Sequence, residues 1–148
     1  PKAFALVTAS NFLKTTPPAW LIKGLIPQQG LVMLFGPSGG GKSFITLDMV
    51  LGIARGVAWC GMRTKQAKVA YVVTEGRAGF RNRLYAYARH HKVDFDTVDL
   101  RLLTQTPDLT HDEDGKALSE LIRKSGGADV IVVDTLAQAA AGASRTVF

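Results

Sequence analysis

The sequence predicts an α/β fold, with a mostly parallel β-sheet and helices flanking it. The chain contains continuous apolar runs, which are typical of strands buried on both faces of a sheet. Segments of helical pattern separate these runs. A glycine-rich stretch follows the first of these runs, and an aspartate ends the last. The resulting order of strand, helix, strand, helix, strand, helix, strand is that of a doubly wound sheet.

The composition agrees with one folded domain over 1–148. Hydrophobic residues make up 47% of the 148 and charged residues 20%, which argues against a disordered or low-complexity chain. No run approaches the roughly 18 consecutive apolar residues that cross a membrane, so no membrane association is expected. The single cysteine, Cys60, cannot form a disulfide within the chain, which favours a reducing compartment such as the cytoplasm.

An excess of basic residues points to an anionic partner. Lys and Arg number 18 and Asp and Glu 12, giving a net charge of +6, which suits a nucleotide or a nucleic acid. Many of the cations lie in 77–92, a predicted helix. They are either a face that contacts nucleic acid or another subunit, or a solvated face opposite Phe80, Leu84 and Tyr87. The sequence leaves both interpretations open.

An N-terminal lead-in over 1–29 is expected to be irregular. Two prolines in Thr15-Thr16-Pro17-Pro18 prevent a continuous helix. Residues 20–22 form a short extended apolar piece, and 27–30 are predicted to turn. The core then occupies 30–136, and a tail rich in small residues occupies 137–148.

The strands and helices of the core follow from their local patterns. The helix predicted over 42–55 stops at Gly56, a favoured C-terminal residue. In the last helix, Thr110 and Glu113 have capping-box spacing, and basic residues precede a glycine pair. Its apolar face comprises Leu118, Leu121 and Ile122. The predicted strands are 31–35, 69–73, 100–103 and 130–134.

Residues 36–43 fit the pattern G-x-x-x-x-G-K-[ST] at every fixed position. Glycines let backbone N–H groups surround polyphosphate, and the helix that follows directs its positive end toward it. Lys42 is expected to reach the β and γ phosphates, and the Ser43 hydroxyl to ligate Mg²⁺. An ordinary glycine-rich turn before a helix is the alternative. The predicted nucleotide-binding residues are Gly36, Pro37, Ser38, Gly39, Gly40, Gly41, Lys42, Ser43 and Phe44.

Two carboxylates complete the predicted catalytic set with Lys42. Asp134 ends an apolar strand, where ligands gather in α/β sheets, and we expect it to hold Mg²⁺ together with Ser43. Glu75 ends an earlier strand and is expected to orient an attacking water. The alternatives are a strand-end Asp satisfied by a neighbouring helix and a surface-loop Glu. Because Thr135 follows Asp134, ATPases with a catalytic Glu at that position are disfavoured.

Together these features resemble the RecA-like ATPases. The resemblance covers roughly 8–137 and rests on the loop, on 69–83, on the run 130–137 and on the lead-in 18–27. Within that family the chain is most similar to the branch of the RepA hexameric replicative helicase.

The resemblance assigns roles to four residues. It makes Lys42 the Walker A lysine, Ser43 a Mg²⁺ ligand, Glu75 the catalytic glutamate and Asp134 the Walker B aspartate. It also implies ATP as ligand, homo-oligomeric rings that bind ATP between subunits, and action on DNA.

RecA-like cores continue past the Walker B strand, so the resemblance makes this core incomplete at its C-terminal end. One further family strand lies between the strands predicted at 31–35 and 130–134. Without it, these two are expected to pair directly, to leave a slot, or to borrow a strand from another molecule.

Three functions therefore stand as expectations. The first is a Mg²⁺-dependent ATPase of replicative or recombination type. The second is a nucleotide-binding module without turnover that regulates a partner ATPase. The third is a small-molecule kinase.

Overall fold

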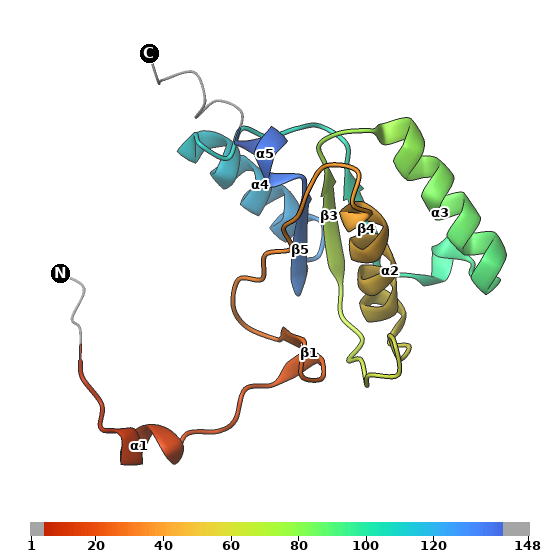
Figure 1. The fold of residues 1–148 in the computed structure, drawn as a ribbon. Helices are drawn as coiled ribbons and strands as arrows, with labels where there is room; N and C mark the ends of the chain where they lie inside the picture. Colours follow the sequence, from red (N-terminus) through yellow and green to blue (C-terminus); the bar gives the residue numbers. More distant parts are fainter. Residues whose placement is uncertain (1–4, 141–148) are drawn as a thin grey trace.

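A three-stranded parallel sheet lies at the centre of the molecule (Figure 1). The structure is a computed structural model and describes residues 5–140. The central strand is β3 (Val69–Val73), with β4 (Leu100–Leu103) on one side and β5 (Val130–Asp134) on the other. In this register Val73 lies opposite Asp134, so the ends of β3 and β5 are neighbours.

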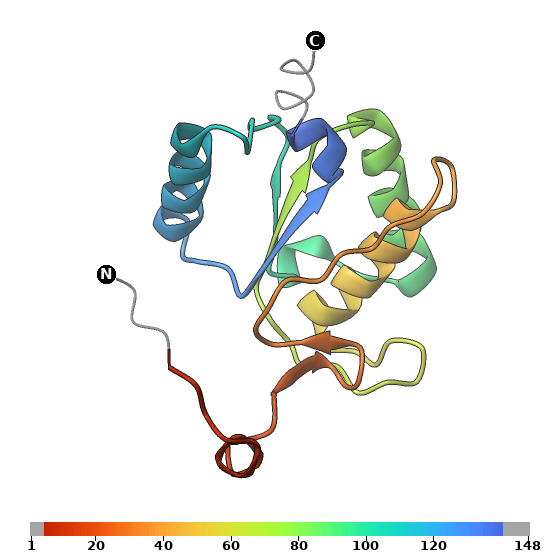
Figure 2. The same ribbon diagram turned by 60° about the vertical axis from the view of Figure 1, so that its left-hand side comes forward.

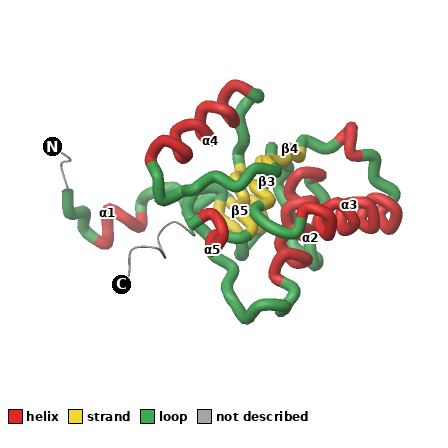
Figure 3. The backbone as a smooth tube through the Cα atoms, turned by 90° about the horizontal axis from the view of Figure 1, so that it is seen from above, coloured by secondary structure: helices red, strands yellow, loops and turns green. Residues whose placement is uncertain are grey.

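Helices lie on both faces of this sheet, which gives the α/β architecture that the sequence predicts (Figures 2 and 3). One face carries α2 (Lys42–Arg55) and α3 (Arg77–His91), and the other carries α4 (Asp112–Lys124). A short 3₁₀ helix, η1 (Phe95–Thr97), precedes β4.

The main core lies between β3 and the α2–α3 layer. Apolar side chains of α2 are excluded from water because they pack on β3, and burying each stabilises the fold by about 1.5–3 kcal/mol. From α3, Phe80 is buried with its ring centroid 4.9 Å from that of Tyr71. Buried members of this cluster include Leu47, Val50, Leu51, Ile53, Val69, Tyr71 and Val73.

The amphipathic pattern predicted for α3 is confirmed. Phe80 is buried, and Leu84 and Tyr87 pack against the same core. Most of the basic side chains face solvent. The exposed ones are Arg77, Arg81, Arg89, His90, His91 and Lys92.

The prediction of a strand at 31–35 is wrong. This segment runs toward the glycine-rich loop (Figure 2), but no described residue pairs with it as a strand. Leu31 is 91% exposed and Phe35 85%. An apolar run becomes a strand only where it lies alongside a partner backbone, and in residues 5–140 the outer edges of β4 and β5 pair with no other strand. Of the expected arrangements, direct pairing with β5 is absent from residues 5–140.

The lead-in is more ordered than the sequence suggests. It contains a one-turn helix, α1 (Ala9–Leu13), and an antiparallel pair, β1 (Trp20–Ile22) with β2 (Ile26–Pro27). Leu21 and Ile22 are buried in the main core. The backbone around them is held by bonds from Lys23 N to Arg63 O, 2.9 Å, and from Lys65 N to Leu21 O, 2.7 Å. The extended piece predicted at 20–22 is therefore confirmed as β1, and the expectation of an irregular segment fails only at α1 and β2.

The beginning of α4 also differs from the prediction. Thr110 is not the cap: its hydroxyl donates to Asp108 Oδ1 at 2.6 Å, and His111 occupies the N-cap position. Three acidic residues in the first turn supply the negative charge that stabilises a helix start. Leu121 of the predicted apolar face is 51% exposed, so this face of α4 is not packed into the described core.

The predicted tail begins with a short helix, α5 (Leu136–Ala139), whose Ala139 is buried. Its remaining part, 141–148, lies outside the described residues. Among residues 5–140, no helix has the length and apolar character needed to cross a bilayer.

Candidate nucleotide-binding site

The glycine-rich loop 36–43 joins the extended segment 31–35 to α2, as Figure 1 shows. Gly41 is the N-cap of α2 and has φ of +77°, in the left-handed region that favours glycine. A Cβ on Gly40 would lie 3.1 Å from Pro37 O, tighter than a side chain normally tolerates. Both positions therefore favour glycine, and the loop ends at the start of a 14-residue helix.

Lys42 folds over this loop. Its ammonium donates to Gly36 O at 2.9 Å and to Pro37 O at 2.8 Å. A cation held by two neutral carbonyls can exchange them for anionic oxygens, because charge-assisted hydrogen bonds are stronger. The predicted phosphate-binding lysine is thus at the loop from which it would act.

Ser43 and Asp134, the two predicted magnesium ligands, are brought into direct contact. Ser43 Oγ, in the first turn of α2, donates to Asp134 Oδ1, at the end of β5, at 2.9 Å. Hydroxyl and carboxylate oxygens are ligands suited to Mg²⁺. Within residues 5–140 no group of three or more His, Cys, Asp and Glu side chains could hold a metal ion. A cation at this pair would therefore need further oxygens from a bound phosphate or from water.

Tyr71 is a member of the site that sequence reasoning missed. Its hydroxyl donates to Asp134 Oδ2 at 2.8 Å, from a side chain that is fully buried. Burial, then the hydrogen bond to Asp134 and the charge of that carboxylate, raise the pKa of Tyr71 far above its ordinary value. The phenol is therefore a neutral donor at physiological pH. In the sequence Tyr71 is only one apolar residue of a buried strand.

Thr74 and Thr135 were also missed, and they tie the ends of β3 and β5 together. Thr135 N donates to Thr74 Oγ1 at 2.6 Å, and that hydroxyl donates to Thr135 O at 3.1 Å. Thr74 N in turn donates to Asp134 O at 2.9 Å. These bonds fix the backbone on which the Asp134 side chain stands.

Glu75, the predicted catalytic glutamate, makes no hydrogen bond to the Ser43–Asp134 pair. It lies between β3 and α3, exposed, one residue beyond Thr74. Among the hydrogen bonds and ion pairs of the described residues, none involves its carboxylate. It therefore shares the carboxyl end of the sheet with Asp134 but remains a loop carboxylate.

Phe44, predicted to be next to the nucleotide, is 63% exposed. The guanidinium of Arg83, from α3, lies 4.8 Å from the centre of its ring. Both residues line an open groove of about 840 Å³ between α2 and α3. Of the predicted site residues, only Phe44 lines this groove, so it is not the phosphate-binding region itself.

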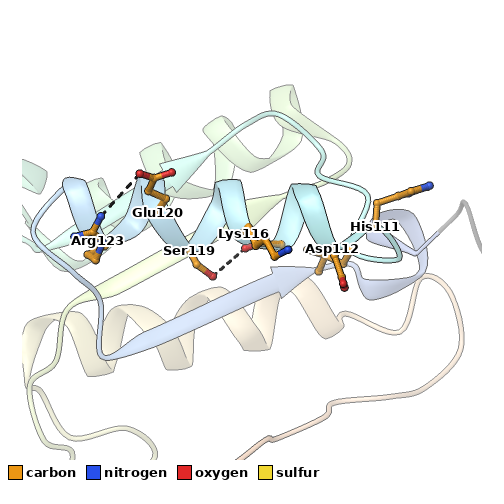
Figure 4. Close-up of a pocket in the computed structure, with 8 residues that line it drawn as sticks. His111, Asp112, Lys116, Ser119, Glu120 and Arg123 are labelled. Atoms are coloured by element: carbon orange, nitrogen blue, oxygen red, sulfur yellow. Dashed lines mark hydrogen bonds and ion pairs between the residues drawn. The ribbon is translucent and has the colours of Figure 1, made fainter.

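A second depression, of about 670 Å³, runs along α4 (Figure 4). Two of its polar side chains have partners on the same helix. Ser119 Oγ donates to Gly115 O at 2.9 Å, and Glu120 pairs with Lys124 at 3.0 Å and more distantly with Arg123. None of the predicted site residues lines it, and it is an ion-paired helix surface.

Comparison with known proteins gives one family. The model of the AAA domain family matches residues 2–146, nearly the whole chain. Searches of curated proteins and of solved structures give no match. The matched range contains the glycine-rich loop, Glu75 and Asp134. The chain therefore belongs to the AAA domain family of P-loop, nucleotide-binding ATPases.

Proposed function

We propose that this chain binds ATP with Mg²⁺ at the loop 36–43 and Asp134, and that it hydrolyses the bound ATP. The observation that carries the proposal is the hydrogen bond between Ser43 Oγ and Asp134 Oδ1, 2.9 Å long. It joins the end of a phosphate-loop pattern to a strand-end carboxylate from a distant part of the chain. An ordinary glycine-rich turn would need no such partner.

The residues present fit a magnesium ion. Ser43 and Asp134 supply hard oxygen donors and would hold the ion. When bound, Mg²⁺ neutralises negative charge on the phosphate oxygens. Gly40 and Gly41 carry no side chains, which gives the phosphates an approach to the loop backbone.

Lys42 and Glu75 have separate tasks in hydrolysis. Lys42 leaves the carbonyls of Gly36 and Pro37 and donates to the β and γ phosphates, stabilising the charge of the transition state. Glu75, an exposed loop carboxylate, orients the attacking water and accepts its proton. The water oxygen bonds to the γ-phosphorus as the bond from that phosphorus to the β–γ bridging oxygen breaks, and ADP and inorganic phosphate are released.

The test is Lys42→Ala, compared with Lys68→Ala as a matched control. Lys68 Nζ also donates to a backbone carbonyl, that of Gly126 at 3.3 Å, far from the loop in sequence. We expect Lys42→Ala to abolish ATP binding and turnover, and Lys68→Ala to retain both. Equal turnover in wild type and Lys42→Ala would overturn the proposal.

A nucleotide-binding module without turnover, acting on a partner ATPase, is a second candidate. The exposed position of Glu75, without a hydrogen bond to the Ser43–Asp134 pair, favours it. Saturable ATP binding with no phosphate release, alone or with DNA, would support this candidate. Robust hydrolysis would exclude it.

We further propose that the ATPase is of the replicative or recombination type, acts on DNA and assembles from identical subunits. The resemblance to the RepA branch, the net charge of +6 and the solvent-facing cations of α3 support this. Single-stranded DNA should stimulate turnover, and the stimulation should weaken as salt rises. Native mass measured with and without ATP tests the assembly. Turnover that is indifferent to DNA and a monomeric mass would refute this proposal.

A further inference from the structure

Both oxygens of the Asp134 carboxylate accept a hydrogen bond from within the chain. Ser43 donates to Oδ1 at 2.9 Å, and Tyr71 donates to Oδ2 at 2.8 Å. The two donors differ in kind. Ser43 belongs to the predicted phosphate-binding apparatus, whereas Tyr71 lies on the central strand and is fully buried.

The Tyr71 hydroxyl is held rigidly. Its backbone is in register with Leu102 of β4 and Val132 of β5, and its ring packs on Phe80 at 4.9 Å between centroids. Asp134 is different: it is the last residue of β5 and is partly exposed. A carboxylate rotates easily about its terminal torsion. A fixed donor on one of its oxygens determines the plane of the group.

We propose that Tyr71 is a positioning residue for Asp134, holding Oδ2 so that Oδ1 is presented to Ser43 and to a divalent cation. This inference rests on the proposed function of the Ser43–Asp134 pair. Tyr71 lies behind the carboxylate in the core and acts only through Asp134. Partners in this position usually change metal affinity by about 10–100-fold when they are removed.

The alternative is a purely structural tyrosine, whose ring fills the core and whose hydroxyl is merely satisfied. Tyr71→Phe separates the two, because it keeps the ring and removes only the oxygen. Tyr85→Phe is the matched control, since Tyr85 is 66% exposed on α3. Each variant is made in the full 148-residue chain and checked for folding by circular dichroism.

The measurement is ADP affinity as a function of Mg²⁺ concentration. For Tyr71→Phe we expect the half-saturating Mg²⁺ concentration to rise about tenfold, with the affinity for ADP in EDTA unchanged. Tyr85→Phe should match wild type in both. An unchanged Mg²⁺ dependence in Tyr71→Phe overturns the positioning role, and so does an equal loss of affinity with and without Mg²⁺.

Asp134→Asn distinguishes this failure from a failure of the proposed function. If Asp134→Asn loses the Mg²⁺ dependence and Tyr71→Phe does not, only the inference about Tyr71 is wrong. If Asp134→Asn also leaves it unchanged, the assignment of Asp134 as a metal-binding residue is wrong, and the role of Tyr71 is refuted with it.

A second measurement leaves Tyr71 itself unchanged. The chain has three tyrosines, so fluorotyrosine labelling gives a short fluorine spectrum that Tyr85→Phe and Tyr87→Phe assign. Mg²⁺ added to the ADP-saturated protein should shift the Tyr71 resonance with the midpoint of binding. A resonance that does not move during this titration would count against the proposal.

Discussion

Ser43 Oγ donates a 2.9 Å hydrogen bond to Asp134 Oδ1, although 91 residues separate them in sequence. Ser43 is placed by the loop that begins α2, and Asp134 by the register of β5 against β3. The bond thus joins α2 to β5, and both lie within residues 2–146, which the AAA domain family model matches.

Removing the Ser43 hydroxyl tests this relationship. Ser43→Ala should lower the free energy of unfolding by about 1 kcal/mol, because Asp134 loses one of its two donors. It should also raise the Mg²⁺ concentration needed for ATP binding by about tenfold. Urea denaturation and Mg²⁺ titration measure the two effects. Ser119→Ala, whose hydroxyl bonds only to Gly115 O on exposed α4, is the control. A wild-type Mg²⁺ response in Ser43→Ala would contradict the prediction.

Glu75→Gln should separate binding from chemistry. The amide keeps the size of the side chain but cannot accept a proton, so turnover should fall by about 10²–10⁴-fold while ATP affinity stays within a factor of two. Phosphate release and equilibrium ATP binding are the measurements. Glu113→Gln, on the exposed first turn of α4, is the matched control. If Glu75→Gln turns over at the wild-type rate, another group orients the water.

Alanine substitutions at Gly41 and Gly115 should have opposite effects on stability. Gly41→Ala places a residue with a side chain in the left-handed region, so it should lower the free energy of unfolding by about 1–2 kcal/mol. It should also lower the affinity for ATP. Gly115→Ala, within α4 and with open space around the position, should stabilise the chain by about 0.5–1 kcal/mol. Thermal unfolding and ATP binding of both variants test this. Equal effects of the two substitutions would be inconsistent with the described loop.

The raised pKa of Tyr71 predicts a specific loss of stability in alkali. In the unfolded chain this phenol ionises near pH 10, whereas the folded protein keeps the proton to higher pH. Its contribution is therefore complete below about pH 10. Above that, the free energy of unfolding should fall by about 1.4 kcal/mol per pH unit, a slope that Tyr71→Phe lacks.

Urea denaturation midpoints at pH 8 and pH 11 test whether the contribution of Tyr71 to stability falls as the pH rises. Tyr71→Phe should be about 1 kcal/mol less stable than wild type at pH 8, and the difference should vanish near pH 11. Tyr85→Phe should follow wild type at both values. A difference that grows with pH would show that the hydroxyl is ionised in the folded state.

The exposed run 31–35 predicts self-association. Contiguous apolar side chains near an unpaired strand edge are an aggregation hazard. Met33→Lys should reduce light scattering at high concentration without changing ATP affinity, since Met33 is 61% exposed. Tyr85→Lys, an equally exposed site on α3 at 66%, should leave scattering unchanged. Equal scattering of all three proteins would contradict this.

Much of the fold and part of the site can be predicted from the sequence. The helix from Lys42 to Arg55 and the strands β3, β4 and β5 follow from helical composition, from continuous apolar runs and from the glycine or charged residues at their ends. These are local properties, decided by residues close in sequence. The same applies to the loop glycines, because backbone conformation at Gly41 depends on its immediate neighbours.

Strand pairing depends on distant parts of the chain, so the local sequence pattern was not enough to predict it. The run 31–35 has the composition of a buried strand but no described partner, so its apolar character alone could not make it one. Thr110 has the spacing of a cap, yet its hydroxyl donates to Asp108 and His111 takes the N-cap position.

The sequence by itself determined the chemistry available to this protein: a phosphate-loop lysine and serine, a strand-end aspartate and a loop glutamate. Only the tertiary structure decided which of them meet. The register that sets Val73 opposite Asp134 also carries Tyr71 to Oδ2 and Thr74 to Thr135, and it leaves Glu75 in solvent. The physical reason is that hydrogen bonds between strands and helices depend on positions within a few ångströms, which are set by packing and register across the whole sheet.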